Sequence, residues 1–204
     1  MKEGFAIVGA GAFARETLDI LEAINAFHPV YEFYGFLVER DYLNHDEICG
    51  YEVHAGLNVR GMPYVIAIGD PSVRRRLADQ IDGRPGSLVH PSAVLGKRVD
   101  YGDGTIICAG SILTTNVELG NHVHVNLGCT IGHDCLLRDY VTLSPGVHLS
   151  GRVAVGEGVE IGTGAVVLPD LCIGSGARVG AGAVVTKNVP SGVTVVGVPA
   201  RVRS

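Results

Sequence analysis

The residue pair His133–Asp134 joins a side chain that titrates near neutral pH to a carboxylate. A histidine of this kind can take up a proton at physiological pH, and an adjacent carboxylate can steady the imidazolium ion that results. The pair therefore predicts a centre for general acid–base chemistry.

A second motif lies near the start of the chain. The segment Gly9 to Ala14 resembles the G-x-G-x-x-G/A turn, and it follows an apolar strand-like run, Phe5 to Val8. The apolar residues from Arg15 to Ala26 have helical spacing, so a helix is expected to follow the turn. A phosphate bound at the turn would then lie at the N-terminus of this helix. The α/β part contains too few strands for a full dinucleotide domain, so a mononucleotide or nucleotide-sugar group fits better than a nicotinamide cofactor. A turn that binds nothing is the alternative.

The second half of the chain repeats every six residues. Sixteen of the seventeen positions reached in steps of six from Val89 to Val185 are aliphatic, and Tyr101 is the exception. This period fits neither a helix nor a plain alternating strand, so it predicts short strands joined by regular corners. Three hexads close one triangular coil, and coils stack about 4.8 Å apart. Residues eighteen apart then lie above one another, which places Gly151 over an outward-pointing His133.

The first half indicates a small α/β unit. Further strands are expected at Tyr31 to Val38, which ends near Glu39, and at Tyr64 to Ile68, which leads into Gly69. Asp70 can cap the helix that follows. The Pro–Gly segment at residues 84–87 is the expected hinge. We predict a Rossmann-like domain at residues 1–85 and an all-β left-handed parallel β-helix with a C-terminal tail at residues 86–204.

Composition excludes several classes of function. The 204 residues are 47% apolar and carry a net charge of −5, which gives no basic field for nucleic acid. No stretch approaches eighteen consecutive apolar residues, and the N-terminal residues carry charges where a signal peptide needs an apolar run. The five cysteines are odd in number and form no C-x-x-C pair, which favours reduced thiols. We expect a cytoplasmic protein with no membrane insertion and no nucleic-acid partner.

The uninterrupted hexads resemble the left-handed β-helix of the hexapeptide-repeat acyltransferases. The ending Val189 to Val202 is similar to the usual terminus of that family, and Asn126 with His133–Asp134 matches its N-x6-H-[DE] signature. Together with the Rossmann-like domain at residues 1–85, called the cap below, the chain resembles the sugar acetyltransferase branch of that family. That resemblance implies acetyl-CoA as co-substrate, no metal, and N-acetylation of a nucleotide-linked amino sugar of the 4-amino-4,6-dideoxyhexose type. O-acetylation of sialic acid or another sugar is the alternative.

The resemblance also implies roles for individual residues. His133 becomes the general base, Asp134 its partner, and Gly151 a backbone donor to the thioester carbonyl. Asn126 matches the asparagine of the family, where it either contacts substrate or caps a turn. The family alignment places four residues beside the cofactor: Thr142, Gly151, Thr163 and Ala181. Thr142 stands where related enzymes carry a second histidine. The cap residues expected to bind the nucleotide sugar are Gly9, Gly11, Arg15, Glu39, Ile68 and Gly69.

Two other functions share parts of this pattern. Histidines at outward hexad positions suggest the γ-class carbonic anhydrases, which bind zinc between subunits. The zinc ligands of that class include a pair about two coils apart, which is thirty-six residues here. No pair among His90, His122, His124, His133 and His148 has this separation. The N-terminal domain would also have no purpose in a carbonic anhydrase. A scaffold that only binds partners is the other alternative. The flat-sided prism has no second wall for coenzyme A within one chain, so we expect a homotrimer.

Overall fold

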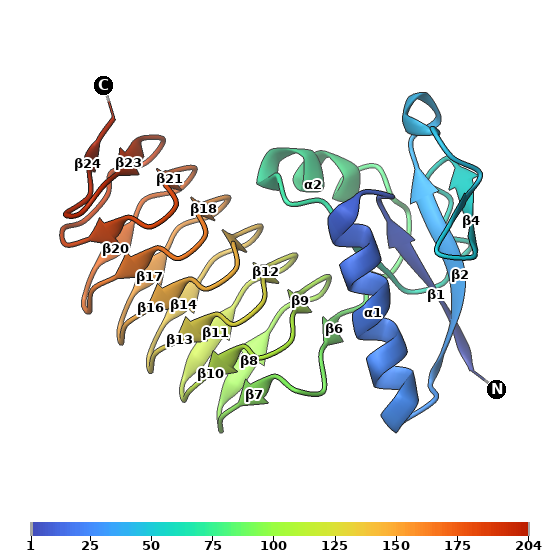
Figure 1. Ribbon diagram of the computed structural model, residues 1–204, viewed down its shortest axis with the longest axis horizontal. Helices are drawn as coiled ribbons and strands as arrows, with labels where there is room; N and C mark the ends of the chain where they lie inside the picture. Colours follow the sequence, from blue (N-terminus) through green and yellow to red (C-terminus); the bar gives the residue numbers. More distant parts are fainter. Residues whose placement is uncertain (1, 204) are drawn as a thin grey trace.

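The computed structural model describes residues 2–203, which form a cap of one sheet and two helices on the end of a three-sided prism (Figure 1). The cap sheet has the order β3-β4-β2-β1-β5, and only the β3–β4 pair is antiparallel. Its strands are β1 (Glu3–Val8), β2 (Tyr31–Val38), β3 (Glu47–Ile48), β4 (Tyr51–Ala55) and β5 (Tyr64–Ile66). The sheet is Rossmann-like, as the sequence predicted.

The two cap helices cover opposite faces of this sheet. Side chains alternate along β1, so Phe5 and Ile7 pack with α1 (Ala12–Phe27), whereas Ala6 and Val8 pack toward α2 (Pro71–Ala78). The carboxylate of Asp70 accepts hydrogen bonds from the N–H groups of Ser72 (2.8 Å) and Val73 (3.2 Å). Asp70 therefore caps α2, which confirms the sequence-based expectation.

The prism has three faces of short parallel strands, as a left-handed β-helix requires. Face 1 contains β6 (Leu88–Val89), β9 (Ile106–Ile107), β12 (His124–Val125), β15 (Thr142–Leu143), β18 (Glu160–Ile161), β21 (Arg178–Val179), β23 (Thr194–Val196) and β24 (Arg201–Val202). Face 2 contains β7 (Val94–Leu95), β10 (Ile112–Leu113), β13 (Thr130–Ile131), β16 (His148–Leu149), β19 (Val166–Val167) and β22 (Val184–Val185). Face 3 contains β8 (Val99–Tyr101), β11 (Val117–Leu119), β14 (Leu136–Leu137), β17 (Ala154–Val155) and β20 (Cys172–Ile173).

The register between coils is eighteen residues, as the hexads predicted. Thr130 pairs with His148, and Ile131 pairs with Leu149. The aliphatic hexad positions point inward, and Val125, Ile131 and Leu137 are fully buried. Tyr101, the one exception in the sequence, is 42% exposed near the cap end of the prism.

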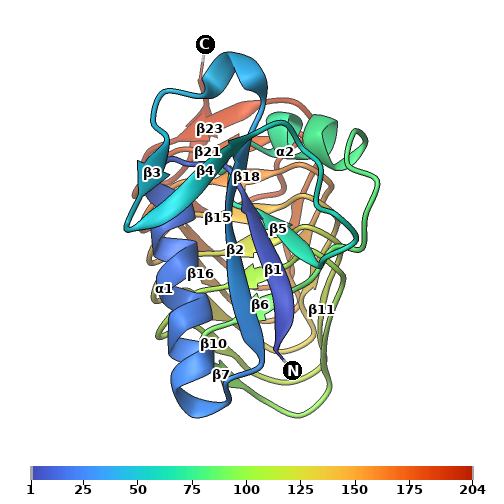
Figure 2. The same cartoon turned by 90° about the vertical axis from the view of Figure 1, so that its right-hand side faces the viewer.

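Helix α1 lies between the cap sheet and the prism (Figures 1 and 2). Its side chains Leu18 and Leu21 share a core cluster with Leu88 and Ile106 from the first strands of face 1. The cap thus packs against the first coils. The predicted division after residue 85 falls between the end of α2 and the start of β6 and stays a prediction.

The other end of the prism is closed differently. Strand β24 reverses direction and pairs antiparallel with β23, and Ala200 N–H donates to the carbonyl of Val184 (2.8 Å). The two strands belong to the end of face 1 that lies farthest from the cap (Figure 1).

Several expectations from composition concern the described residues as a whole. All five cysteines fall within residues 2–203 and carry free thiols. No helix in this part of the chain is long and apolar enough to cross a membrane. Within the same residues, no group of three or more His, Cys, Asp or Glu side chains is arranged to hold a metal ion.

Candidate active site

His133 and Asp134 form a hydrogen-bonded dyad at the corner between faces 2 and 3. His133 Nδ1 lies 2.7 Å from Asp134 Oδ2, and both side chains are about half exposed. A carboxylate only accepts hydrogen bonds, so Nδ1 carries the proton and Nε2 keeps a free lone pair. A second donor, the amide of Asn116, reaches Asp134 Oδ1 at 2.9 Å. The hydrogen bonds from Asn116 and then His133 lower the pKa of Asp134, which stays ionised.

Gly151 lies directly above the imidazole, as the eighteen-residue register predicted. A Cβ atom placed on Gly151 would stand 2.5 Å from His133 Nε2. Only glycine leaves room for the ring here, because any side chain would push it away from its present position. Within residues 2–203 the N–H group of Gly151 has no hydrogen-bond partner. The dyad therefore places a basic nitrogen at the corner that also carries the backbone N–H of Gly151.

Two of the three other residues expected beside the cofactor lie on a different corner. Thr163 follows β18 and Ala181 follows β21, so both belong to the corner between faces 1 and 2. Both are exposed, and Thr163 accepts a hydrogen bond from Gly182 N–H (2.8 Å). Face 2 separates this corner from His133 and Gly151.

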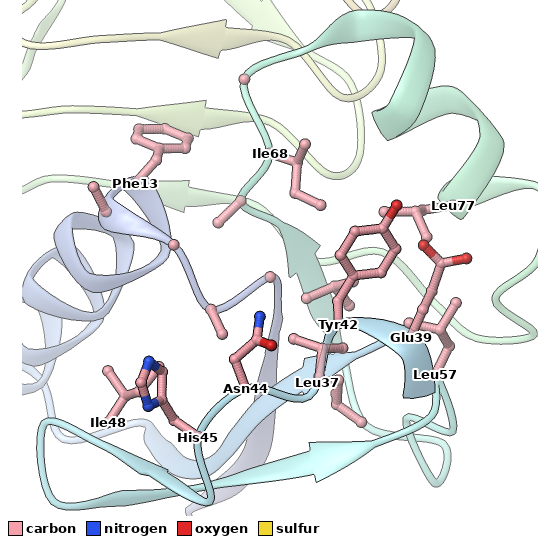
Figure 3. A pocket seen from close by; sticks show the side chains of 18 residues that line it. Phe13, Leu37, Glu39, Tyr42, Asn44, His45, Ile48, Leu57, Ile68 and Leu77 are labelled. Atoms are coloured by element: carbon pink, nitrogen blue, oxygen red, sulfur yellow. The ribbon is translucent and has the colours of Figure 1, made fainter.

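A cavity of about 520 Å³ opens at the carboxyl ends of β1, β2 and β5 (Figure 3). Five of the predicted substrate residues line it: Gly9, Gly11, Glu39, Ile68 and Gly69. Ligands bind at this edge of open α/β sheets, where a helix N-terminus offers free N–H groups. The volume is of the size that small-molecule and cofactor sites have.

The two glycines of the turn serve the cavity in different ways. Gly9 has a φ of +111°, and a Cβ there would lie 3.1 Å from the carbonyl of Ala67. Backbone conformation and close packing therefore both require glycine at position 9. Gly11 caps α1 with a φ of −82°, and a Cβ there would meet no atom within 4 Å. The space beside Gly11 is open cavity.

Glu39 carries the negative charge in the cavity wall. It forms a two-pronged ion pair with Arg76 of α2, at 2.6 and 2.8 Å. The hydrogen bonds from Arg76 lower the pKa of the Glu39 carboxyl. The carboxylate is thus held in a fixed orientation as a hydrogen-bond acceptor.

Sequence reasoning missed part of the cavity. Tyr42, Asn44 and His45 line it from the segment after β2, which contains a short 3-10 helix, η1 (Arg40–Tyr42). Figure 3 shows Tyr42 near Glu39 at one end of the cavity and His45 beside Ile48 at the other. This segment has no hydrophobic period, so only its polar and aromatic composition after a strand could have pointed to it.

Three predicted site residues lie elsewhere. Arg15 lines a neighbouring pocket with His45 and is not among the residues that line the 520 Å³ cavity. Asn126 directs its side-chain amide to the carbonyl of Leu143 (2.6 Å), so it ties one coil to the next. Thr142 is buried on face 1, where its hydroxyl donates to Gly69 O (2.8 Å). The structure therefore gives Thr142 a contact with the cap, and its expected place beside the cofactor stays a prediction.

Arg74 joins the cavity to the prism. Its buried guanidinium donates to Ile68 O (2.7 Å) and Gly69 O (3.1 Å) in the cavity wall. The same group donates to Tyr140 O (2.8 Å) and to the hydroxyl of Thr142 (2.9 Å), which follow His133 in the prism. Burial lowers the pKa of Arg74 to about 9, and it remains charged at neutral pH.

Two histidines are buried beside Arg74. His122 stacks on Tyr140, with ring centroids 5.2 Å apart, and His124 packs against Phe13 at 5.0 Å. Burial, and then the charge of Arg74, lowers the pKa of His122 to about 4 and that of His124 well below its usual range. Both rings are therefore neutral parts of the interface between cap and prism.

Family models match both parts of the chain. The model described as PglD N-terminal domain matches residues 5–81, and that described as bacterial transferase hexapeptide (six repeats) matches residues 152–187. No curated protein gives a match.

Solved structures match over almost the whole length. A mutant of perosamine N-acetyltransferase from Caulobacter crescentus, in complex with CoA and GDP-perosamine, is 28% identical with a TM-score of 0.91, covering 98% of this chain and 97% of that one. The acetyltransferase domain of PglB from Neisseria gonorrhoeae, in complex with acetyl coenzyme A, is 29% identical with a TM-score of 0.89 and full coverage of both chains. WeeI from Acinetobacter baumannii is 31% identical with a TM-score of 0.85, covering 98% of this chain and 99% of that one. The cap, the hexapeptide prism and these full-length similarities show that the chain belongs to the hexapeptide-repeat sugar acetyltransferases with a PglD-type N-terminal domain.

Proposed function

We propose that the protein transfers the acetyl group of acetyl-CoA to the amino group of a nucleotide-linked amino sugar, of the 4-amino-4,6-dideoxyhexose type. The observation that carries the proposal is the His133–Asp134 dyad, which stands under the free N–H of Gly151 in a chain that also holds a nucleotide-sized cavity. The similar enzyme from Caulobacter crescentus, solved with CoA and GDP-perosamine, supports this choice of substrates.

The geometry of the dyad suits direct transfer. The amine nitrogen of the sugar attacks the carbonyl carbon of the thioester, and His133 Nε2 accepts the proton that the amine loses. The negative charge on the carbonyl oxygen is stabilised by Gly151 N–H. When the tetrahedral intermediate collapses, the carbon–sulfur bond breaks and the proton passes from His133 to the sulfur of coenzyme A. Asp134 stabilises the imidazolium between these two steps.

The acceptor would enter through the cap. A diphosphate at the N-terminus of α1 would accept hydrogen bonds from the N–H groups beside Gly11, and Glu39 would accept hydrogen bonds from the nucleoside. Ile68 and Gly69 form the opposite wall. Arg15 lies close enough in the neighbouring pocket to add positive charge.

Acetyl-CoA would lie along face 2. Gly151 marks one edge of this face, while Thr163 and Ala181 mark the other, so a bound chain would cross it near the outward-facing His148. This arrangement agrees with the family-based expectation for the three residues. The cofactor and the free thiols also favour a cytoplasmic location.

The active unit would be a homotrimer. Neither His133 nor Asp134 lines the cap cavity, so one chain does not surround an acceptor on both sides. Face 2 also exposes the apolar side chains Val94 and Ile112. A neighbouring prism would cover this face and supply the second wall for coenzyme A.

The test is a panel of nucleotide amino sugars incubated with acetyl-CoA, with release of free thiol as the rate and mass spectrometry of the product. The expected product is heavier by one acetyl group attached to nitrogen. Matched reactions with the free amino sugar and with sialic acid are the controls. Acetylation of free sialic acid, without turnover of any nucleotide sugar, would overturn the proposal.

A further inference from the structure

A line of polar side chains leads along the prism corner to the catalytic dyad. Arg98, Asn116 and Asp134 are spaced eighteen residues apart and stack on successive coils. Arg98 Nε donates to Asn116 Oδ1 at 2.6 Å, and Asn116 Nδ2 donates to Asp134 Oδ1 at 2.9 Å. Asp134 Oδ2 then accepts from His133 Nδ1 at 2.7 Å.

Each group in this line fixes the next. Arg98 can only donate, so the oxygen of the Asn116 amide must face Arg98. The amide nitrogen is thereby turned toward Asp134. It engages one carboxylate oxygen and leaves the other for His133, which holds the carboxylate plane in one orientation.

The backbone supports the same arrangement. Arg98, Asn116 and Asp134 all have positive φ values, of 61°, 53° and 60°. Asparagine and aspartate tolerate this conformation better than most residues. The repeated corner therefore projects three polar side chains in register, one above the other.

We infer that Asn116 is a positioning residue for the reaction, oriented by Arg98, and that it sets the orientation of Asp134 and through it the tautomer of His133. The inference rests on the proposed function, because it assigns Asn116 a part in holding the general base. In this assignment Asn116 acts through Asp134, the group that its side-chain amide donates to.

Asn116→Gly is the sharpest test, since glycine removes the amide and accepts a φ of 53° without strain. Loss of one hydrogen bond should lower kcat about fivefold while the KM of both substrates stays unchanged. Without this donor the carboxylate is free to turn and stabilises the imidazolium of His133 less, so the acid limb of the pH dependence of kcat/KM should move to lower pH. The ¹⁵N resonances of His133 should change from one tautomer to a mixture.

Two further variants separate this role from a structural one. Arg98→Met leaves the amide in place but free to turn over, so it should produce a smaller change in the same direction, whereas Arg98→Lys should restore wild-type behaviour. The control is Asn121→Ala, because Asn121 also contacts an aspartate one coil above, Asp139, but at a corner without the dyad.

The outcomes are distinct. Wild-type kcat and an unmoved acid limb in Asn116→Gly would overturn the inference, and so would an equal loss in Asn121→Ala. If Asn116→Gly is unstable, an unchanged pH profile in Arg98→Met would overturn it. Failure of the wild-type enzyme to acetylate any nucleotide amino sugar would instead refute the proposed function itself.

Discussion

At His133 one ring nitrogen is tied down and the other is open. Nδ1 is held by Asp134, while Nε2 points to the space under Gly151. The side chain is half exposed and contributes nothing to the prism core, where the aliphatic side chains are fully buried. Chemistry and folding are therefore separable at this residue.

His133→Ala should lower kcat by roughly 10²–10⁴-fold, the range for loss of a general base, while assembly and acetyl-CoA affinity persist. If the acceptor amine is largely deprotonated in the assay, raising the pH should restore part of the activity. His90→Ala is the matched control, because His90 is a prism histidine whose Nδ1 lies 2.8 Å from the hydroxyl of Ser92 rather than beside a carboxylate. Unimpaired turnover of His133→Ala at every pH contradicts the mechanism.

The sequence could predict this centre because the hexads fix a register. Counting eighteen residues from His133 leads to Gly151, and the structure places the two in contact. The same counting cannot tell which outward face the cap will cover. Thr142 points outward like His148, yet the cap buries it, because docking of α2 depends on contacts between residues far apart in the sequence.

Among the elements, α1 lines the cap cavity with the backbone at its start. Gly11 is the N-cap residue, and no side chain satisfies the first N–H groups of the helix. The sequence predicted this turn because its glycines follow an apolar run. It could not predict the wall formed by residues 42–45, since a loop between short strands has no periodic signal.

Gly11→Val should raise the KM of the nucleotide sugar at least tenfold, because a branched side chain would fill space beside the helix N-terminus. The KM of acetyl-CoA should stay constant, since the site proposed for that ligand lies on the prism. The melting temperature should change little, because a φ of −82° suits any residue and a Cβ meets no neighbour. Equal losses for both ligands would mean that the turn only supports the fold.

Helix α2 offers a direct comparison between two adjacent arginines. Arg74 is buried and serves carbonyl groups of cap and prism, whereas Arg75 pairs with Glu157 at the surface. Arg74→Met should cost several kcal/mol, because it leaves buried acceptors without donors. Arg75→Met should cost less than about 1 kcal/mol. Urea unfolding of the two variants measures the difference, and similar losses would show that Arg74 does not hold the two domains together.

For the whole molecule, the interface between cap and prism makes stability depend on pH. His122 is neutral in the folded state, with a pKa of about 4, and has a pKa near 6.5 when unfolded. Arg74 opposes its protonation, while Asp139 and Asp103 favour it less strongly. Above pH 6.5 the ring is neutral in both states. As the pH falls from 6.5 to 4 the unfolded chain binds the proton first, so stability is lost.

The loss from His122 should reach roughly 3 kcal/mol at pH 4. Urea midpoints measured at fixed protein concentration should fall steeply below pH 6. His122→Asn should make this dependence shallower, because asparagine accepts the φ of 53° at this position and does not titrate, while the buried His124 still contributes. An equally steep fall in the variant would place the acid-sensitive group elsewhere.

The antiparallel strand β24 has a consequence for molecules that meet end to end. Every coil of a parallel stack is a template for the next, so a bare terminal coil invites another molecule to continue the stack and grow into a fibre. One end of this prism is covered by α1, and at the other β24 pairs with β23 in the opposite direction to the parallel strands. The chain can therefore stack its own coils, but neither end of the prism offers a free parallel strand to a further copy of the molecule.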